Sequence, residues 1–390
     1  MISRDEILAF RDEWGIREDV IEKDYVLGWL LAAIAAQPEL RTQWVFKGGT
    51  CLRKCFHETY RFSEDLDFTV VSGGPETAED LLPVFARVDE WLRARSGIEL
   101  EVVPSMVRRA QNRRGNPTTT LRIGYRGPRN PPNLPKVKID LTSDEVLVGP
   151  TDARGILHPY SDADALSVEV TTYNIAELLA EKIRALVERC RPRDLYDVIH
   201  MYRHPNLLDL AAVVHAALRV KCQHAGIPVP DARTVLSSPF RAELEQEWAN
   251  MLEHQLPHLP SVEEYWAAVE AMFNWLGGAR LPKLPRAEGK ERLDPDWVPP
   301  RSMASWGGRP LERIRYAGSN RLKVEIDYRA EEGRHGWRRV EPYAFRRTQE
   351  GNVIFFLVND RGELRSYRTD RIADVRITDE SFVPTYLIEF

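Results

Sequence analysis

Two neighbouring segments decide the fold: Phe46-Lys47-Gly48-Gly49-Thr50, and then Arg61-Phe62-Ser63-Glu64-Asp65-Leu66-Asp67-Phe68. The glycine pair stands between a predicted strand and a predicted helix. Glycine has no side chain, so the backbone at such a pair approaches a phosphate closely. The N-terminus of the helix that follows favours negative charge. The first segment therefore predicts a phosphate-binding turn, although a Gly-Gly-Thr sequence taken alone is usually an ordinary turn.

The second segment places two carboxylates on one strand. Asp65 and Asp67 are two residues apart, so their side chains point to the same face. Close carboxylates repel each other unless a cation lies between them, and Mg²⁺ or Mn²⁺ prefers oxygen ligands of this kind. Asp140, at the end of another predicted strand, supplies a third carboxylate. The three residues together predict a two-metal site that activates an attacking hydroxyl and stabilises a leaving pyrophosphate. An Asp-x-Asp pair taken alone is more often a solvated strand edge.

Hydrophobic periodicity predicts an N-terminal mixed region followed by a helical one. Predicted strands cover 44–46, 66–70, 100–103, 119–125 and 136–141. Predicted helices cover 20–37, 51–60, 81–95, 175–189, 194–202, 207–225, 240–254 and 262–276. The segment 108–117, rich in Arg, Asn, Gly and Pro, is predicted to be a flexible loop.

The predicted fold class is α+β, with four consecutive parts. Residues 1–160 form a mixed sheet with helices, and residues 161–278 form a helical lobe that completes the active site. Residues 279–310 are rich in Gly, Pro and Arg and form a linker. Residues 311–390 contain short strands separated by turn signals, which predicts a small all-β barrel of the SH3 type.

Composition excludes several classes of protein. Hydrophobic residues make up 43% of the chain and charged residues 29%, values typical of a folded protein rather than a disordered one. No apolar run reaches the ~18 residues of a membrane span, and no secretion signal is recognisable. The four cysteines lack zinc-site spacing, which indicates thiols in a reducing cytoplasm.

The net charge of −5 conceals a basic segment. Between Val102 and Ile139 there is no Asp or Glu, while seven arginines and two lysines occur: Arg108, Arg109, Arg113, Arg114, Arg122, Arg126, Arg129, Lys136 and Lys138. This segment leads into the strand that carries Asp140, so it is suited to hold a nucleic-acid backbone beside the carboxylates. The alternative is a solvated basic loop without a ligand.

These motifs together resemble the nucleotidyltransferase superfamily of the DNA polymerase β type, and most closely the AbiEii/AbiGii family of abortive-infection and toxin–antitoxin nucleotidyltransferases. The resemblance covers about residues 15 to 275. Besides the two segments above, it is carried by Glu22-Lys23-Asp24-Tyr25, Lys138-Ile139-Asp140, Glu181-Lys182-Ile183-Arg184-Ala185-Leu186 and Arg191-Pro192-Arg193-Asp194-Leu195-Tyr196-Asp197.

The resemblance implies a toxin that transfers NMP from an NTP to an acceptor, with a tRNA 3′ end as the favoured acceptor and a cognate antitoxin as partner. It also implies that Lys182 and Asp194 are active-site residues. The groups expected to hold the triphosphate are Gly48, Gly49, Thr50, Ser63 and Lys182. Lys182 would neutralise phosphate charge, with Asp194 or Asp197 orienting it; the alternative is an ion-pair network that only ties two helices together. Ser63 binds phosphate, accepts a transferred group, or caps the turn.

Two other functions remain open at this stage. The first is a related enzyme that modifies a protein by nucleotidylation or phosphorylation. The second is a nucleotide-sensing regulator in which the C-terminal barrel is the working part. No helix-turn-helix precedes the barrel, which argues against a transcription factor.

The C-terminal segment 313–390 resembles the WYL domain. The matching text includes Arg339-Val340-Glu341-Pro342-Tyr343 and Tyr367-Arg368-Thr369-Asp370-Arg371-Ile372, with Phe355-Phe356-Leu357 at the name-giving triplet. The triplet thus lacks a tyrosine hydroxyl. Arg346, Arg368 and Arg371 are the candidates for binding a nucleotide or nucleic acid; the alternative is a barrel that serves as an interaction module. Arg365, Arg368 and Arg371 recur at three-residue spacing, so in a strand they would not all share one face.

Overall fold

The computed structural model describes residues 1–57, 60–71, 73–111, 115–280, 282–285, 292–299, 310–330 and 335–390. The chain forms two compact units. The first comprises Met1–Leu178, Arg219–Pro228 and Leu252–Pro257, and the second comprises Leu179–Leu218, Val229–Met251 and His258–Phe390. Helices and a mixed sheet make this an α+β protein, which confirms the predicted class.

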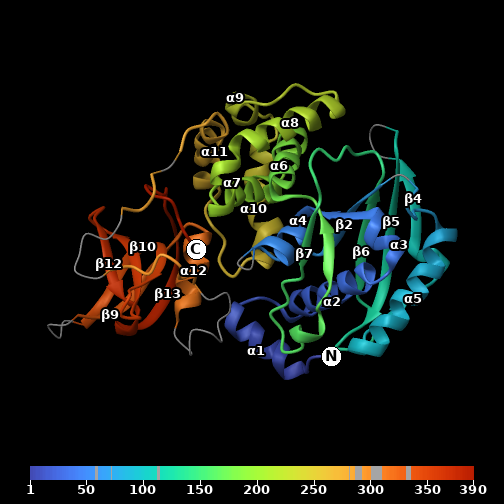
Figure 1. Ribbon diagram of the computed structural model, residues 1–390, viewed down its shortest axis with the longest axis horizontal. Coiled ribbons are helices and arrows are strands. Elements are labelled where there is room, and N and C mark those ends of the chain that lie inside the picture. Colours follow the sequence, from blue (N-terminus) through green and yellow to red (C-terminus); the bar gives the residue numbers. More distant parts are fainter. Residues whose placement is uncertain are drawn as a thin grey trace. The chain divides into compact units, whose positions relative to one another are not determined.

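The first unit combines helices with a large sheet (Figure 1). Its helices are α1 (Arg4–Trp14), α2 (Glu18–Ala35), α3 (Pro38–Gln43), α4 (Gly48–Cys51) and α5 (Ala78–Ser96), and a π-helical turn at Leu52–Phe56 continues α4. Its strands are β1 (Trp44–Lys47), β2 (Asp65–Val70), β3 (Glu99–Glu101), β4 (Val107–Gln111), β5 (Pro117–Arg126), β6 (Lys136–Thr142), β7 (Asp152–Gly155) and β8 (Glu169–Thr172).

The sheet has the strand order β3-β5-β6-β2-β1-β8-β7, and β4 pairs with β5. The pairs β2–β6 and β1–β8 are parallel, whereas the remaining pairs are antiparallel. The parallel pairing brings β2 and β6, which are far apart in sequence, side by side at the centre of the sheet.

One face of this sheet is apolar. The side chains of Phe46, Leu66, Phe68, Leu121 and Ile139 are at most 1% exposed. The ring of Trp44 on the same face lies 5.1 Å from the ring of Phe68 and 6.2 Å from that of Phe85 in α5. Since side chains alternate along a strand, the residues between these apolar ones point to the opposite face.

The prediction of a loop at 108–117 is wrong for its first residues, 108–111. Val107–Gln111 forms strand β4, which pairs antiparallel with the threonine-rich start of β5. Threonine favours strands, and an edge strand tolerates charged side chains on its exposed side. Residues 112–114, which include Arg113 and Arg114, lie outside the described residues.

The second unit begins with helices. They are α6 (Ile175–Arg189), α7 (Pro192–Tyr202), α8 (Ala211–Ala225), α9 (Ala232–Leu236), α10 (Arg241–Leu252) and α11 (Val262–Leu276); α6, α8 and α10 each run partly within the first unit. The bounds of α6 and α11 are as predicted. The predicted helix 207–225 is interrupted, because Pro205–Leu210 is a 3₁₀ helix.

The C-terminal part opens with a helix, not with a strand as predicted. Helix α12 (Leu311–Ser319) buries Leu311, Ile314 and Ala317 at three-residue spacing in the core of the sheet that follows. That antiparallel sheet has the order β12-β11-β10-β9-β13, with β9 (Leu322–Arg329), β10 (His335–Arg347), β11 (Val353–Asn359), β12 (Leu364–Arg368) and β13 (Ile372–Ser381). Of the predicted linker, residues 281, 286–291 and 300–309 lie outside the described residues.

The Phe355-Phe356-Leu357 triplet divides between the two cores of this sheet. Phe355 and Leu357 pack with α12 and β9, whereas Phe356 packs on the opposite face with Tyr343 and Phe382. All three side chains are at most 2% exposed. The triplet therefore contributes to packing and not to an open binding surface.

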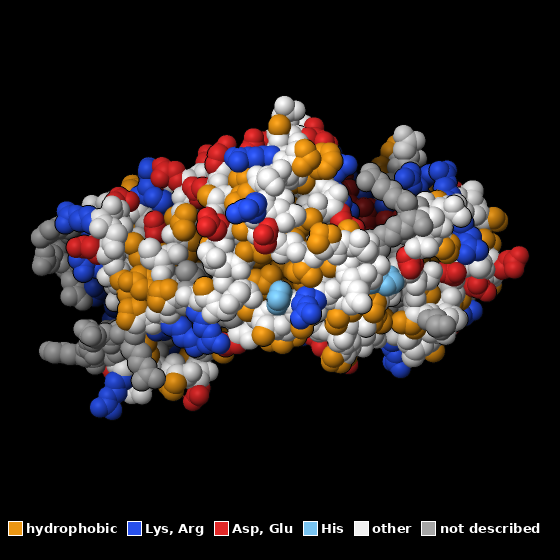
Figure 2. All heavy atoms as spheres, turned by 90° about the horizontal axis from the view of Figure 1, so that it is seen from above, with side chains coloured by type: hydrophobic (Ala, Val, Ile, Leu, Met, Phe, Trp, Pro, Cys, Tyr) orange, Lys and Arg blue, Asp and Glu red, His pale blue; other side chains and the backbone are white. Residues whose placement is uncertain are grey.

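The face of the molecule in Figure 2 shows acidic and basic side chains interspersed, with hydrophobic ones between them. A net charge of −5 thus does not produce a field of a single sign over this face. None of the described helices has the length and apolar character needed to cross a membrane. Cys51, Cys55, Cys190 and Cys222 are buried thiols.

His158 makes the stability of the first unit sensitive to pH. Burial lowers the pKa of this histidine below its ordinary value, although its ring nitrogen Nε2 lies 3.1 Å from Asp162 Oδ1. As the pH falls below ~6.5, the unfolded chain binds a proton at this position that the folded chain does not, so the folded state loses stability.

We expect the free energy of unfolding to fall between pH 7 and pH 5 by up to ~1.4 kcal/mol per pH unit from this residue. His158→Gln should flatten that slope in denaturant titrations, whereas substitution of the exposed His215 by Gln should leave it unchanged. An equal slope in the wild type and the His158 variant would contradict the assignment.

Candidate active site

A row of polar side chains crosses the face of the first unit's sheet that is opposite the apolar one. Strand register places Lys47 of β1 opposite Asp67 of β2, Asp67 opposite Asp140 of β6, and Asp140 opposite Thr120 of β5. Thr120 in turn lies opposite Arg108 of β4. Directly paired residues share a face, so this row brings together two of the predicted carboxylates with a lysine and an arginine.

The adjacent row contains the third carboxylate. Asp65 lies opposite Lys138, and Lys138 lies opposite Arg122. Burial raises the pKa of Asp65, and the positive charge of Lys138 lowers it by a smaller amount. The predicted set Asp65, Asp67 and Asp140 therefore occupies one face of two neighbouring strands.

Both oxygens of Asp140 accept hydrogen bonds. Thr120 Oγ1 donates to Oδ1 at 2.8 Å, and the ammonium of Lys138 forms an ion pair with Oδ2. Among the described residues, no group of three His, Cys, Asp or Glu side chains is close enough to hold a metal ion. The donor set itself suits Mg²⁺, because it consists of carboxylate oxygens on one face, as this hard cation requires.

The glycine pair brings the backbone against these carboxylates. Gly48 has φ +83°, and a Cβ atom added there would lie 2.2 Å from Asp67 Oδ2. A Cβ atom at Gly49 would lie 3.1 Å from Ser63 Oγ. The side chain of Thr50 donates a hydrogen bond to the carbonyl oxygen of Asp65. Four of the five residues that were predicted to hold the triphosphate thus lie close together beside β2, whereas the fifth, Lys182, belongs to the second unit.

The loop that carries Ser63 is held by a buried ion-pair cluster. Asp24 accepts hydrogen bonds from Arg53 at 2.6 Å and from Lys54 at 2.7 Å. Burial alone would raise the pKa of Asp24, but these two cations outweigh it and hold the pKa well below its ordinary value. Arg53 also donates to the carbonyl oxygen of Tyr60 at 2.8 Å and covers the ring of Phe62 at 3.5 Å.

A second contact fixes the same loop from the C-terminal part of the first unit. Arg61 donates to Gln255 Oε1 at 3.0 Å, and the backbone N–H of Phe62 donates to the Gln255 carbonyl at 2.8 Å. Sequence reasoning missed Gln255, because nothing in its neighbourhood resembles a motif. For Asp24, the signal was present in the Glu22-Lys23-Asp24-Tyr25 segment, but no role followed from it.

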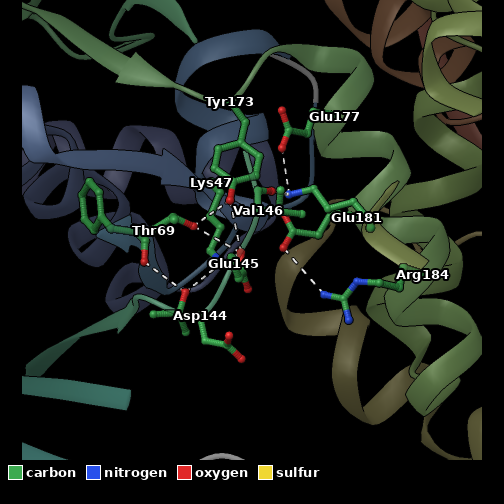
Figure 3. A network of polar contacts seen from close by, with 12 residues as sticks. Lys47, Thr69, Asp144, Glu145, Val146, Tyr173, Glu177, Glu181 and Arg184 are labelled. Carbon is green, nitrogen blue, oxygen red and sulfur yellow. Dashed lines mark hydrogen bonds and ion pairs between the residues drawn. The ribbon is translucent and has the colours of Figure 1, made fainter. Parts of the chain in front are cut away.

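Lys47 has an acidic partner beside the carboxylates. Its ammonium donates to Thr142 Oγ1 at 3.0 Å and pairs with Glu145, which also accepts from Thr69 at 3.2 Å and from Tyr173 at 3.1 Å (Figure 3). This network ties the segment that follows β6 to β1 and β2. It thereby fixes the end of the strand that carries Asp140.

Lys182 and Asp194 belong to the second unit, where each has a partner. Lys182 Nζ lies 2.7 Å from Asp197 Oδ2, and Asp194 accepts two hydrogen bonds from Arg189, at 2.7 and 2.8 Å. Of the two acids considered for orienting Lys182, it is Asp197 that contacts it. The catalytic roles of Lys182 and Asp194 stay predictions.

Two of the three C-terminal arginine candidates lie together. Arg346 and Arg368 are both opposite Ile354, from the two strands that flank β11, so they share a face. Arg346 pairs with Glu389, and Arg368 pairs with Asp370 at 2.7 Å. Arg371 ends the 3₁₀ turn Thr369–Arg371. Arg365 lies opposite Leu357 and thus on the other face from Arg368, as expected.

The family of the chain defines its class, a nucleotidyltransferase. The chain belongs to the nucleotidyl transferase AbiEii toxin family of type IV toxin–antitoxin systems, whose model matches residues 29–273. A WYL domain matches residues 310–377. Both resemblances seen in the sequence are thereby confirmed. Membership of the family implies an NTP substrate and a cognate antitoxin.

Other comparisons are more distant. No match is found among curated proteins. Among solved structures, the chain is similar to MenT4, a nucleotidyltransferase toxin of Mycobacterium tuberculosis H37Rv, with 20% identity, a TM-score of 0.47, and coverage of 72% of this chain and 91% of that chain. It is also similar to the proteasome accessory factor B/C of Arthrobacter aurescens, with 13% identity, a TM-score of 0.18, and coverage of 40% of this chain and 22% of that chain.

Gly48→Ala should disable the site without unfolding the protein. The added methyl group would overlap Asp67 Oδ2 and displace this carboxylate, and a displacement of ~1 Å can cost ~100-fold in rate. Gly73→Ala is the matched control, because Gly73 has φ +84° but no atom within 4 Å of the added Cβ. Nucleotide transfer and melting temperature should be measured for both. Equal activity of the two variants would contradict the proposed role of Gly48.

Proposed function

We propose that this toxin transfers NMP from an NTP to the 3′ end of tRNA in a Mg²⁺-dependent reaction. The observation that carries the proposal is the register of β2 and β6, which gathers Asp65, Asp67 and Asp140 on one polar face. The hydroxyl of the acceptor attacks the α-phosphorus in line, the bond to pyrophosphate breaks, and the hydroxyl proton passes to one of the carboxylates. Mg²⁺ held by these three residues supplies neutralisation of the charge on the phosphates.

The groups around the carboxylates hold the triphosphate. Gly48 and Gly49 allow the phosphates to approach the backbone, and the hydroxyls of Thr50 and Ser63 donate hydrogen bonds to them. By resemblance to the family, Lys182 and Asp194 of the second unit are proposed as active-site residues, with Lys182 neutralising phosphate charge.

A polyanionic acceptor is supported by the basic end of the same face. Arg108 and Arg122 are exposed and lie in the two rows that contain Asp140 and Lys138. A strand of RNA that crosses β4 and β5 would therefore place its phosphates against arginines and its end at the carboxylates. Modification of tRNA would stop translation, which suits a toxin in an abortive response to phage.

The remaining parts of the chain have proposed roles as well. Residues 1–160 are the catalytic core, residues 161–278 the helical lobe and residues 279–310 a linker to the WYL domain at 311–390. A nucleotide or nucleic acid is the proposed ligand of Arg346, Arg368 and Arg371. We place the protein in the cytoplasm, where NTPs, tRNA and its antitoxin meet.

The transfer reaction can be tested with α-³²P-labelled NTPs, Mg²⁺, total bacterial tRNA and a protein lysate. Label should enter tRNA, and Asp67→Asn should reduce the rate by at least ~1000-fold, because a charge stabilisation used in the transition state is lost. Asp164→Asn, at an exposed position, is the control. Label in protein instead would favour a protein-modifying enzyme; binding of NTP without transfer would favour the nucleotide-sensing regulator.

The path of the acceptor can be tested separately. Arg108→Glu and Arg122→Glu should raise the KM for tRNA by at least ~10-fold at low salt while the KM for NTP changes little, since each contact to phosphate releases counterions. Arg109→Glu is the matched control: Arg109 is the neighbour of Arg108 but pairs with Glu76, and its register partner is the buried Thr119. An equal effect of all three variants would argue against a path over this face.

A further inference from the structure

The face that carries the three carboxylates also carries a cation of the protein itself. Lys138 lies two residues before Asp140 on β6, so both side chains point to the same face. Its register partner on β2 is Asp65, and the neighbouring pair is Asp67 with Asp140. Lys138 thus lies on the same face as the three residues that are proposed to hold the metal ion.

A direct contact places the ammonium on one of the three carboxylates. Lys138 Nζ forms an ion pair with Asp140 Oδ2, while Thr120 Oγ1 donates a hydrogen bond to Asp140 Oδ1. The charges of Asp140, Asp65 and Asp67 all act to stabilise the charged form of Lys138 against its partial burial. Three carboxylates on one face are therefore compatible with folding, because the lysine provides the counter-charge.

This arrangement has a consequence for metal binding. A divalent cation that coordinates Asp140 Oδ2 has to displace the Lys138 ammonium from this oxygen, since two cations bound to the same oxygen repel each other strongly. The ion pair is partly open to solvent, with side-chain exposures of 35% for Lys138 and 30% for Asp140, so it can be exchanged without breaking a packed core.

We propose that Lys138 is a built-in counter-ion that competes with the divalent metal for the carboxylate cluster and thereby lowers the affinity of the toxin for free metal. The inference rests on the proposed metal site. In this scheme the metal enters together with the phosphates of the NTP, which supply negative charge for the displaced ammonium. Lys138 is a positioning residue that acts through the carboxylates.

The experiment measures binding of Mn²⁺ to the full-length protein without nucleotide, from the loss of the free Mn²⁺ signal in electron paramagnetic resonance. Lys138→Met keeps the length of the side chain but removes its charge, and should bind Mn²⁺ at least ~10-fold more tightly than the wild type. Lys138→Arg should remain close to the wild type. Lys136→Met, on the same strand at an exposed position, should have no effect.

Unchanged or weaker binding by Lys138→Met would overturn the inference and leave the proposed function intact. If neither the wild type nor Lys138→Met bound Mn²⁺ any better than Asp67→Asn, the metal site itself would fail, and the inference with it. Melting temperatures give a second measurement: without metal, Lys138→Met should melt below the wild type, and Mn²⁺ should raise its melting temperature by more than it raises that of the wild type. Equal increases would contradict the competition.

Discussion

The parallel register between β2 and β6 is the constraint on which the active site depends. It sets Asp67 against Asp140 and Asp65 against Lys138. A slip by one residue would move one strand's polar side chains to the other face, where Leu66, Phe68 and Ile139 are now fully or almost fully buried. Burial of these apolar side chains therefore fixes the register, and the register in turn positions the carboxylates on the opposite face.

Ion pairs in the first unit serve two different purposes, which their burial distinguishes. Asp24 is only 1% exposed and pairs with both Arg53 and Lys54, so its removal would leave two buried cations uncompensated at a cost of ~3–5 kcal/mol. This cluster is structural, and its member Arg53 holds the loop with Ser63. The pair between Lys138 and Asp140 is about one-third exposed, and water can replace either partner at little cost. Such a pair is suited to exchange with a ligand.

The sequence predicted the elements that depend on local pattern. Alternation along β2 placed Asp65 and Asp67 on one face, and the helical periods of α6 and α11 gave their bounds. The pairing of β2 with β6 is not a local property, so the position of Lys138 opposite Asp65 did not follow from the sequence. For β4, pairing with β5 outweighed a composition typical of loops.

In the WYL domain, as in the catalytic sheet, the apolar side chains are buried in the core and the charged side chains form partly exposed ion pairs. The Phe355-Phe356-Leu357 triplet is buried in the two hydrophobic cores of this domain. An anionic ligand would therefore have to be bound by polar side chains. Arg346 and Arg368 share a face but already pair with Glu389 and Asp370. Their side chains are 20% and 33% exposed, which makes these pairs, like the one in the catalytic sheet, open to competition from solvent and ligands. An anion that binds there would compete with two carboxylates, those of Glu389 and Asp370, for the two arginines.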